Sequence, residues 1–245
     1  MLATAGAAYA GVDCPTQTDD IETDRPDVTN SSLVVPAGSF QVENGTNYSA
    51  MGRARIVDAT NSRLRLGVDR CTELLLDLPT AFLTTRGSRR AAGSDVAPGL
   101  KRQFVSGAFS ASGVIGVLLP TGDPRISGHG YSPYLQLPWA RELANGWGIS
   151  GMVTLTMTPS ETRTNPTSQV TLVIEHTVGD RGDVFIEGIA DIPAQGHALK
   201  RLNSGASYRL TPTQQIDFHV GMGLDAASPD WFAGIGYSFR FDRLF

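Results

Sequence analysis

The residues that could carry chemistry in this chain are few and scattered. Of the four histidines, only His219 falls clearly on the polar face of a predicted strand. No histidine has a cysteine or carboxylate at metal-ligand spacing, and the sequence contains no phosphate-binding glycine loop and no nucleophile elbow. We therefore expect no metal ion and no cofactor. Ser207 with His219 is the one pair that could serve as nucleophile and base, in a barrel enzyme acting on lipids.

Charged residues of both signs recur at alternate positions within otherwise apolar stretches. The candidate residues on this polar face are Glu43, Arg65, Asp77, Glu187, Asp191, Arg209, Asp217, His219 and Arg240. Such residues could brace an interior by pairing with one another, or they could line a path for a solute. The pattern leaves both interpretations open.

The elements that must position these residues are β-strands. Alternation of apolar and polar residues begins near Phe40 and continues to the end of the chain, broken by turn signals. The predicted strands are 38–48, 54–68, 73–84, 95–105, 109–119, 130–139, 147–157, 168–177, 183–192, 203–210, 214–224 and 230–241. Short turns alternate with longer links at 85–94, 120–129, 158–167 and 193–202. An even strand number with this alternation is typical of membrane barrels.

Composition excludes two classes of protein. Charged residues make up 18% of the chain and the net charge is −4 with a pI of about 5.5, so no basic face exists for binding nucleic acid. The longest apolar stretches are about six residues, against the roughly 20 that a membrane-spanning helix needs.

Alternation alone does not say which face of the sheet is dry. A soluble barrel or sandwich buries its apolar face, whereas a membrane barrel turns that face toward lipid. Charges of both signs suit an internal lumen, and aromatic residues gather where strands end, as at membrane interfaces. These aromatic residues are Trp139, Trp147, Tyr208 and Phe241 at one inferred end, and Trp231 and Tyr131 at the other. We predict an all-β, antiparallel transmembrane β-barrel of about 12 strands with short periplasmic turns and longer outer loops.

The chain divides into three parts. Residues 1–10 end in an A-x-A pattern and are interpreted as the remnant of a signal peptide, or as an Ala-rich terminus. Residues 11–37 are polar and are expected on the periplasmic side, and residues 38–245 form the barrel. Asp24, Arg25 and Asp27 either belong to a solvated tail or enter the barrel mouth as a partial plug.

The two cysteines would lie on the same side of such a barrel. Cys14 precedes the first strand, and Cys71 lies in the short turn between the second and third strands. The periplasm is oxidising, which favours a disulfide between them. Two independent thiols are the alternative.

Three separated motifs resemble one family. Residues 23–27 (TDRPD), residues 119–123 (LPTGD) and the ending from Leu224 to Phe241 are similar to the outer-membrane transporter family associated with the meta-pathway of phenol degradation. The chain departs from this family in a compressed 86–104 region and in continuing past Phe241. The resemblance implies an outer-membrane barrel that transports small, aromatic or apolar molecules.

We therefore expect a passive channel or transporter in the bacterial outer membrane. A lipid-acting barrel enzyme and a structural or adhesive barrel are the alternatives. The expected partners are outer-membrane lipid, a small-molecule solute, and the barrel-assembly machinery, which would bind the C-terminal aromatic strand.

Overall fold

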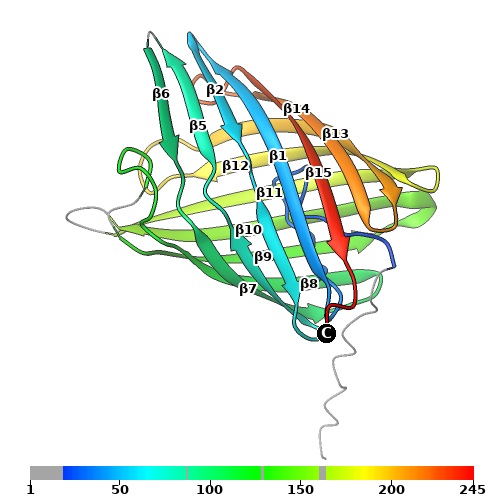
Figure 1. Cartoon of the computed structure of the whole chain (residues 1–245). Coiled ribbons are helices and arrows are strands. Elements are labelled where there is room, and N and C mark those ends of the chain that lie inside the picture. Colours follow the sequence, from blue (N-terminus) through cyan, green and yellow to red (C-terminus); the bar gives the residue numbers. More distant parts are fainter. Residues whose placement is uncertain (1–18, 87, 128–129, 160–163) are drawn as a thin grey trace, which may run out of the picture.

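The computed structural model describes residues 19–86, 88–127, 130–159 and 164–245, and almost all of its regular structure is β-strand (Figure 1). The strands in chain order are β1 (Phe40–Met51), β2 (Ala54–Ala59), β3 (Arg63–Gly67), β4 (Thr72–Asp77), β5 (Ala81–Arg86), β6 (Ser88–Gly93), β7 (Ala97–Val105), β8 (Phe109–Leu118), β9 (Ser132–Glu142), β10 (Trp147–Pro159), β11 (Thr164–Val178), β12 (Gly182–Ile192), β13 (Leu199–Thr211), β14 (Gln214–Gly223) and β15 (Trp231–Phe241). A short 3₁₀ turn, Ala144–Gly146, joins β9 to β10. Within the described residues, no helix is long and apolar enough to cross a membrane.

The sheet closes on itself. Every strand is antiparallel to its neighbours, and β15 pairs with β1 from Phe40 opposite Phe241 to Ala50 opposite Trp231. Closure leaves no edge along this seam, so the backbone groups of the first and last strands are satisfied within the sheet.

Three of the barrel strands are interrupted part-way. β2 and β3 both pair with β1, β4 and β5 pair with β3 and β2, and β6 and β7 pair with β5 and β4. The fifteen segments therefore form twelve barrel strands. Asn61 bridges the interruption: its backbone N–H donates to Gly45 O (2.8 Å), and its Oδ1 accepts from Thr80 Oγ1 (2.9 Å).

The predicted architecture is confirmed, because each of the expected strand ranges overlaps an observed barrel strand. The link expected at 85–94 is wrong. Residues 85–86 and 88–93 belong to β5 and β6, which pair from Ala81 opposite Gly93 to Arg86 opposite Ser88. The sequence from 84 to 90, TTRGSRR, contains no apolar side chain, so the alternation that marks a half-buried strand is missing there.

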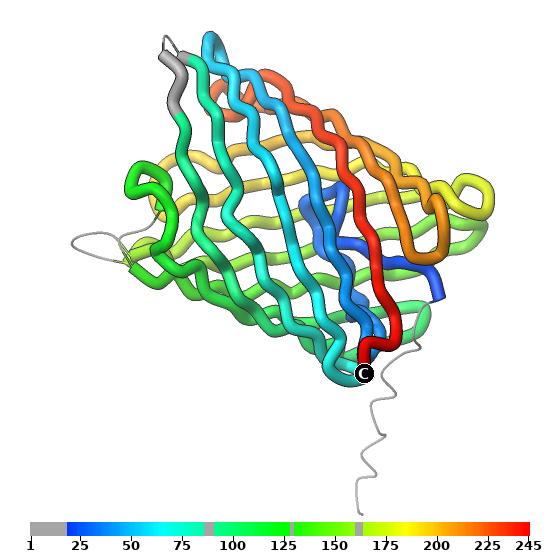
Figure 2. The backbone as a smooth tube through the Cα atoms, in the orientation of Figure 1, coloured from blue at the N-terminus to red at the C-terminus, as the bar shows by residue number. Residues whose placement is uncertain are grey.

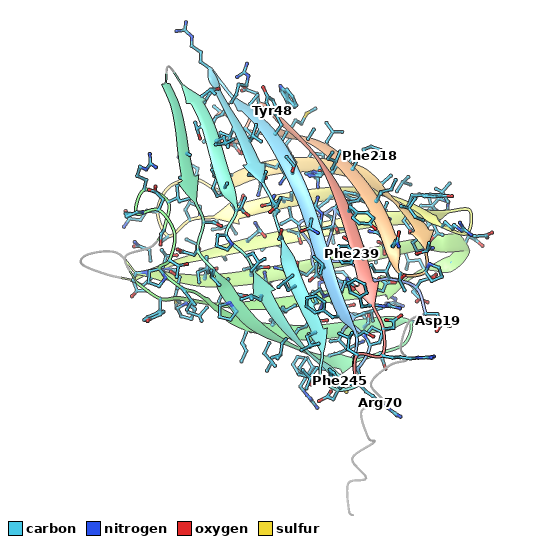
Figure 3. All side chains as sticks on the ribbon, viewed as in Figure 1. Asp19, Tyr48, Arg70, Phe218, Phe239 and Phe245 are labelled. Atoms are coloured by element: carbon cyan, nitrogen blue, oxygen red, sulfur yellow. The ribbon has the colours of Figure 1, made fainter. Side chains whose placement is uncertain are left out.

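Side chains are distributed in the reverse of a soluble barrel. Arg65, Lys101 and Glu187 on the inner face expose 0% of their surface, whereas Phe218 and Ile235 on the outer face expose 55% and 68%. Figure 3 shows Phe218 on the outer surface of the barrel. An apolar face turned outward all around a closed sheet suits lipid, so the prediction of a membrane barrel is confirmed over a soluble one.

Aromatic side chains mark both rims of this outer face. Trp147, Tyr208 and Phe241 are exposed near the end where the chain terminates, and Tyr131 and Trp231 are exposed at the other end. Their positions match the interfacial belts of membrane proteins.

Candidate functional site: the barrel interior

Residues 19–37 run inside the barrel rather than away from it. Figure 2 shows this segment in blue behind β1 and β15. We call it the N-terminal segment. Its side chains reach several parts of the wall: Asn30 Nδ2 donates to Gln136 Oε1 of β9 (2.9 Å), and the hydroxyls of Ser32 and Ser110 of β8 lie 2.6 Å apart. These two contacts fix this part of the segment to the adjacent strands β8 and β9.

Asp24 lies at the centre of a buried cluster of charges. Its carboxylate is 2.9 Å from Arg63 Nη1, and 3.4 Å from both Arg65 Nη1 and Lys101 Nζ. The backbone N–H of Asp24 donates to Glu43 Oε2 at 3.0 Å. Asp24 therefore binds β1, β3 and β7 at once.

The wall around Asp24 balances its own charges. Arg65 bridges Glu43 (2.9 Å) and Glu73 (3.0 Å), and Arg63 lies 2.6 Å from Asp77. The wall charges of this cluster are Arg63, Arg65, Lys101, Glu43, Glu73 and Asp77. The three cations match the three carboxylates, so Asp24 is the additional charge that the segment brings.

Arg25 reaches the side of the barrel formed by β14, β15 and β1. Its Nη2 lies 3.2 Å from Asp217 Oδ1. The guanidinium occupies a slot over Gly45 and Gly236, which lie opposite each other in the pairing of β1 with β15. A Cβ added at Gly236 would lie 2.5 Å from Arg25 Nε, and one at Gly45 would overlap the guanidinium. Glycine at both positions makes this close approach of arginine and wall possible.

Glu187 of β12 accepts several hydrogen bonds from the segment. The backbone N–H groups of Val28 and Thr29 donate to its carboxylate at 3.0 and 2.9 Å, and Thr29 Oγ1 donates at 2.9 Å. Asn203 Nδ2 donates at 3.0 Å to Glu187 Oε2, which also accepts from the backbone N–H of Val28. These donors satisfy a fully buried carboxylate, which would otherwise be costly.

His219 continues this network across the wall. Its Nδ1 lies 3.2 Å from Asn203 Oδ1, and its Nε2 lies 2.9 Å from Asn47 Oδ1. Ser207 is paired with Asp217 instead, while His219 is opposite Gly205. Both ring nitrogens of His219 are thus held by asparagines, and the arrangement of Ser207 and His219 as nucleophile and base is not formed.

Burial favours the protonated form of two acidic groups of the segment. Burial raises the pKa of Glu22 to about 7, against the opposing effect of the Arg209 charge. Burial also raises the pKa of Asp27 well above its usual range, and the charges of Glu187 and Glu175 add to this rise.

Asp24 shows the opposite balance. Burial alone would raise its pKa, but the charges of Arg65, Lys101 and Arg63 outweigh burial and hold the pKa well below its usual range. Asp24 is therefore ionised wherever the segment is docked at neutral pH.

Two cavities adjoin the N-terminal segment. One of about 560 Å³ lies toward the turns that follow β7 and β9, and one of about 350 Å³ lies among β3, β4 and β7. Arg25, Asp27 and Asn30 line both cavities. These three residues therefore stand between the two spaces.

The remaining predicted residues also lie on the inner face, in separate groups. Asp191 Oδ2 is 2.6 Å from Arg201 Nη2, Arg209 Nε is 3.7 Å from Asp20 Oδ2, and Arg240 Nη1 donates to the carbonyl oxygen of Asp20 at 3.0 Å. The structure thus joins Glu43, Arg65 and Asp77 into one cluster but leaves these three apart. Whether any of them contacts a solute stays a prediction.

Several residues of the network are absent from the sequence-based set. They are Gln41, Asn47, Arg63, Glu73 and Asn203. Glu73 was hidden by the run Leu74–Leu76, where Leu75 faces inward and is buried while Leu74 is exposed. Glu73 lies four residues before Asp77, so both side chains point to the same face of the strand. This spacing could have identified Glu73 from the sequence.

Of the two cysteines in the predicted disulfide, the structure describes only Cys71. Cys71 lies in the turn between β3 and β4 and is not a free thiol. Cys14 and the proposed signal remnant at 1–10 lie outside the described residues. The pairing of Cys14 with Cys71 therefore stays a prediction. Within the described residues, no group of His, Cys, Asp and Glu is arranged to hold a metal ion.

A family model matches most of the barrel and the inner part of the N-terminal segment. The match covers residues 23–241, and the family is described as "Putative MetA-pathway of phenol degradation". The chain belongs to this family. The match begins at Thr23, so the family's sequence pattern includes Asp24 and Arg25 as well as the strands. No curated protein matches the chain.

Solved structures of outer-membrane channels share the fold at low sequence identity. The NanC porin is 7% identical with a TM-score of 0.58, over 81% of this chain and 98% of that one. The KdgM porin is 11% identical with a TM-score of 0.56, over 82% and 99%. The CymD monoaromatic hydrocarbon channel is 8% identical with a TM-score of 0.52, over 86% and 90%. The likeness identifies a porin-like β-barrel.

Proposed function

We propose that the protein is an outer-membrane channel through which small molecules diffuse, and that its N-terminal segment narrows the lumen. The observation that carries this proposal is the polar interior with two cavities, which meet at Arg25, Asp27 and Asn30. A barrel of about twelve strands is intermediate between side-chain-filled barrels and open porins, so one crossing segment is enough to narrow its pore.

Two observations support a class of solute: the width of the path through the lumen, and the proteins to which this chain is similar. A path past the N-terminal segment admits only small molecules, because the segment is fixed to β1 through Asp24 and to β9, on the far side of the lumen, through Asn30. The family's name refers to phenol degradation, and the CymD structure is that of a monoaromatic hydrocarbon channel. Both support a small aromatic solute.

The outer membrane is the proposed location. The outward apolar face and the porin-like fold support it. The short turns and the N-terminal segment would then face the periplasm, with the longer connections between β8 and β9 and between β14 and β15 outside. In this orientation Cys71 is periplasmic, as the proposed disulfide requires.

Conductance in planar lipid bilayers tests the proposal. Purified barrel, shown to be folded by its faster migration when unboiled, should give discrete current steps that protein-free bilayers lack. We expect small steps, because the N-terminal segment occupies the lumen. A folded, inserted barrel that gives no steps under any applied voltage would overturn the channel.

A further inference from the structure

Positive charges inside the barrel are matched by carboxylates. In the cluster around Asp24, the three cations of the wall each form at least one ion pair, as described above. The other interior cations are Arg25, Arg201, Arg209 and Arg240, and they lie 2.6–3.6 Å from carboxylate oxygens. Among the described side chains, no cation of the inner face is therefore left to attract an anion.

Some interior carboxylates have no cation beside them. Those that form no ion pair with a described residue include Glu22, Asp27, Asp58, Asp95, Glu175 and Glu187. Three of them accept hydrogen bonds from neutral groups instead, as Asp95 Oδ1 does from Ser127 Oγ at 2.6 Å. Glu22 and Glu175 accept no hydrogen bond through their side chains from any other described residue. The interior therefore carries an excess of negative charge.

Part of this excess faces the larger cavity. Glu22 lines the cavity from the N-terminal segment, and Glu175 lines it from β11, where its side chain is exposed. The inner-face cations at this cavity, Arg25 and Arg209, are already held in ion pairs. Arg141 also borders the cavity but belongs to the outward-facing row of β9, because it pairs with an exposed phenylalanine of β8. A solute in the larger cavity therefore meets more unpaired negative than positive charge.

Protonation decides which carboxyls of the segment carry this charge. Burial raises the pKa of Glu22 to about 7, so Glu22 is ionised above neutral pH. Burial raises the pKa of Asp27 well above its usual range, so Asp27 adds little charge there. Glu175 belongs to a strand of the barrel, and its position does not depend on docking of the segment. Substituting Glu175 therefore changes the charge of the cavity without removing a hydrogen bond of the segment.

We propose that the channel selects for cations over anions, and that Glu175 contributes to this selectivity at the larger cavity. Unbalanced charge within low-dielectric walls raises the local concentration of counterions by roughly 10-fold or more, and acidic side chains in a pore select for cations in this way. The paired cations of the wall add little to the potential, because a carboxylate beside each one offsets its charge. The inference rests on the proposed channel and adds a solute class: ammonium-bearing molecules pass more readily than carboxylates of the same size.

The reversal potential in a KCl gradient measures this selectivity. Barrels shown to be folded by faster migration when unboiled are inserted at pH 8 into planar bilayers of zwitterionic lipid, which adds no surface charge of its own. We expect K⁺ to be about 10-fold more permeant than Cl⁻ in the wild type, and Glu175→Gln to lower this ratio by about 3-fold. Glu175→Lys should lower it further. The matched control is Asp180→Asn, which removes an equal charge from the exposed turn after β11, outside the larger cavity, and should leave the ratio unchanged.

Two aromatic ions of nearly equal size extend the test to organic solutes. With benzylammonium chloride on one side and potassium benzoate in a separate experiment, benzylammonium should be the more permeant of the two organic ions. A wild-type barrel that conducts but passes Cl⁻ as readily as K⁺ would overturn the selectivity and leave the channel standing. An equal ratio in Glu175→Gln, Glu175→Lys and the control would overturn the role of Glu175. Bilayers without current steps would overturn the channel itself, and the selectivity with it.

Discussion

Replacing Asp24 with asparagine should release the N-terminal segment from the lumen while leaving the barrel folded. The substitution Asp24→Asn keeps the size of the side chain and an acceptor oxygen, but removes the charge that faces Arg63, Arg65 and Lys101 at 2.9, 3.4 and 3.4 Å. No backbone hydrogen bond between strands depends on this side chain. The cost therefore applies to docking of the segment rather than to closure of the barrel.

The size of the effect follows from the burial of the cluster. Removing one partner from a buried set of charges costs about 3–5 kcal/mol. The wall charges around Asp24 still pair with one another, as Arg65 does with Glu43 and Glu73, so we expect the lower end of that range. A loss of about 3 kcal/mol shifts the equilibrium between docked and undocked segment by roughly 150-fold.

Hydrogen–deuterium exchange over residues 19–37 and single-channel conductance report on this equilibrium together. In the Asp24→Asn barrel, exchange over the segment should become faster and conductance should rise. The matched control is Asp123→Asn, which breaks an ion pair with Arg125 (2.6 Å) in the exposed connection between β8 and β9 and should change neither. Wild-type exchange and conductance in a folded Asp24→Asn barrel would refute the reasoning.

Three other substitutions or conditions probe the same structure. Gly236→Ala should also raise conductance, because its Cβ would meet the Arg25 guanidinium at 2.5 Å. Gly93→Ala, whose Cβ would have no atom within 4 Å, should leave conductance unchanged. Equal conductance in the two variants would show that Arg25 does not need the glycine at position 236. Docking should weaken as pH rises, since burial raises the pKa of Glu22 from 4.5 to about 7: its contribution is complete below pH 4.5 and is lost as pH rises through about 7. Protection of the segment from exchange, expressed relative to the intrinsic amide exchange rate at each pH, should fall across this range, and Glu22→Gln should remove that fall. Leu155→Arg on the lipid face should lower the free energy of unfolding by roughly 2–4 kcal/mol, and Ser150→Arg, which points into the larger cavity, by less; the reverse order would mean that the apolar face does not contact lipid.

The strands were predictable because each one has a polar face toward the lumen and an apolar face on the outside. Alternation over segments such as Ile216–Leu224 sets the period and the face together, and strand number follows from counting. The interruption at Asn61 and Thr80 was not predictable in the same way. It depends on hydrogen bonds between residues of neighbouring strands, which a period along one strand does not encode.

The charged residues on the inner face of the strands were predictable, but their pairing with the N-terminal segment was not. The inward positions of Glu43, Arg65 and Asp217 follow from the parity of their strands. That Asp24 joins the first two and Arg25 the third depends on the path of a segment without regular structure. The sequence showed only that the segment was polar, which fits a solvated tail equally well.

Liposome swelling tests the central claim, that this barrel passes small molecules and excludes larger ones. Liposomes containing the folded barrel are diluted into iso-osmotic glycerol, glucose, phenyl glucoside or raffinose, and the swelling rate is followed by light scattering. We expect the small solutes to cause faster swelling than in protein-free liposomes, with a rate that decreases as solute size increases. In the Asp24→Asn barrel, we expect the larger solutes to enter faster than in the wild type. Swelling equal to that of protein-free liposomes for every solute would contradict it.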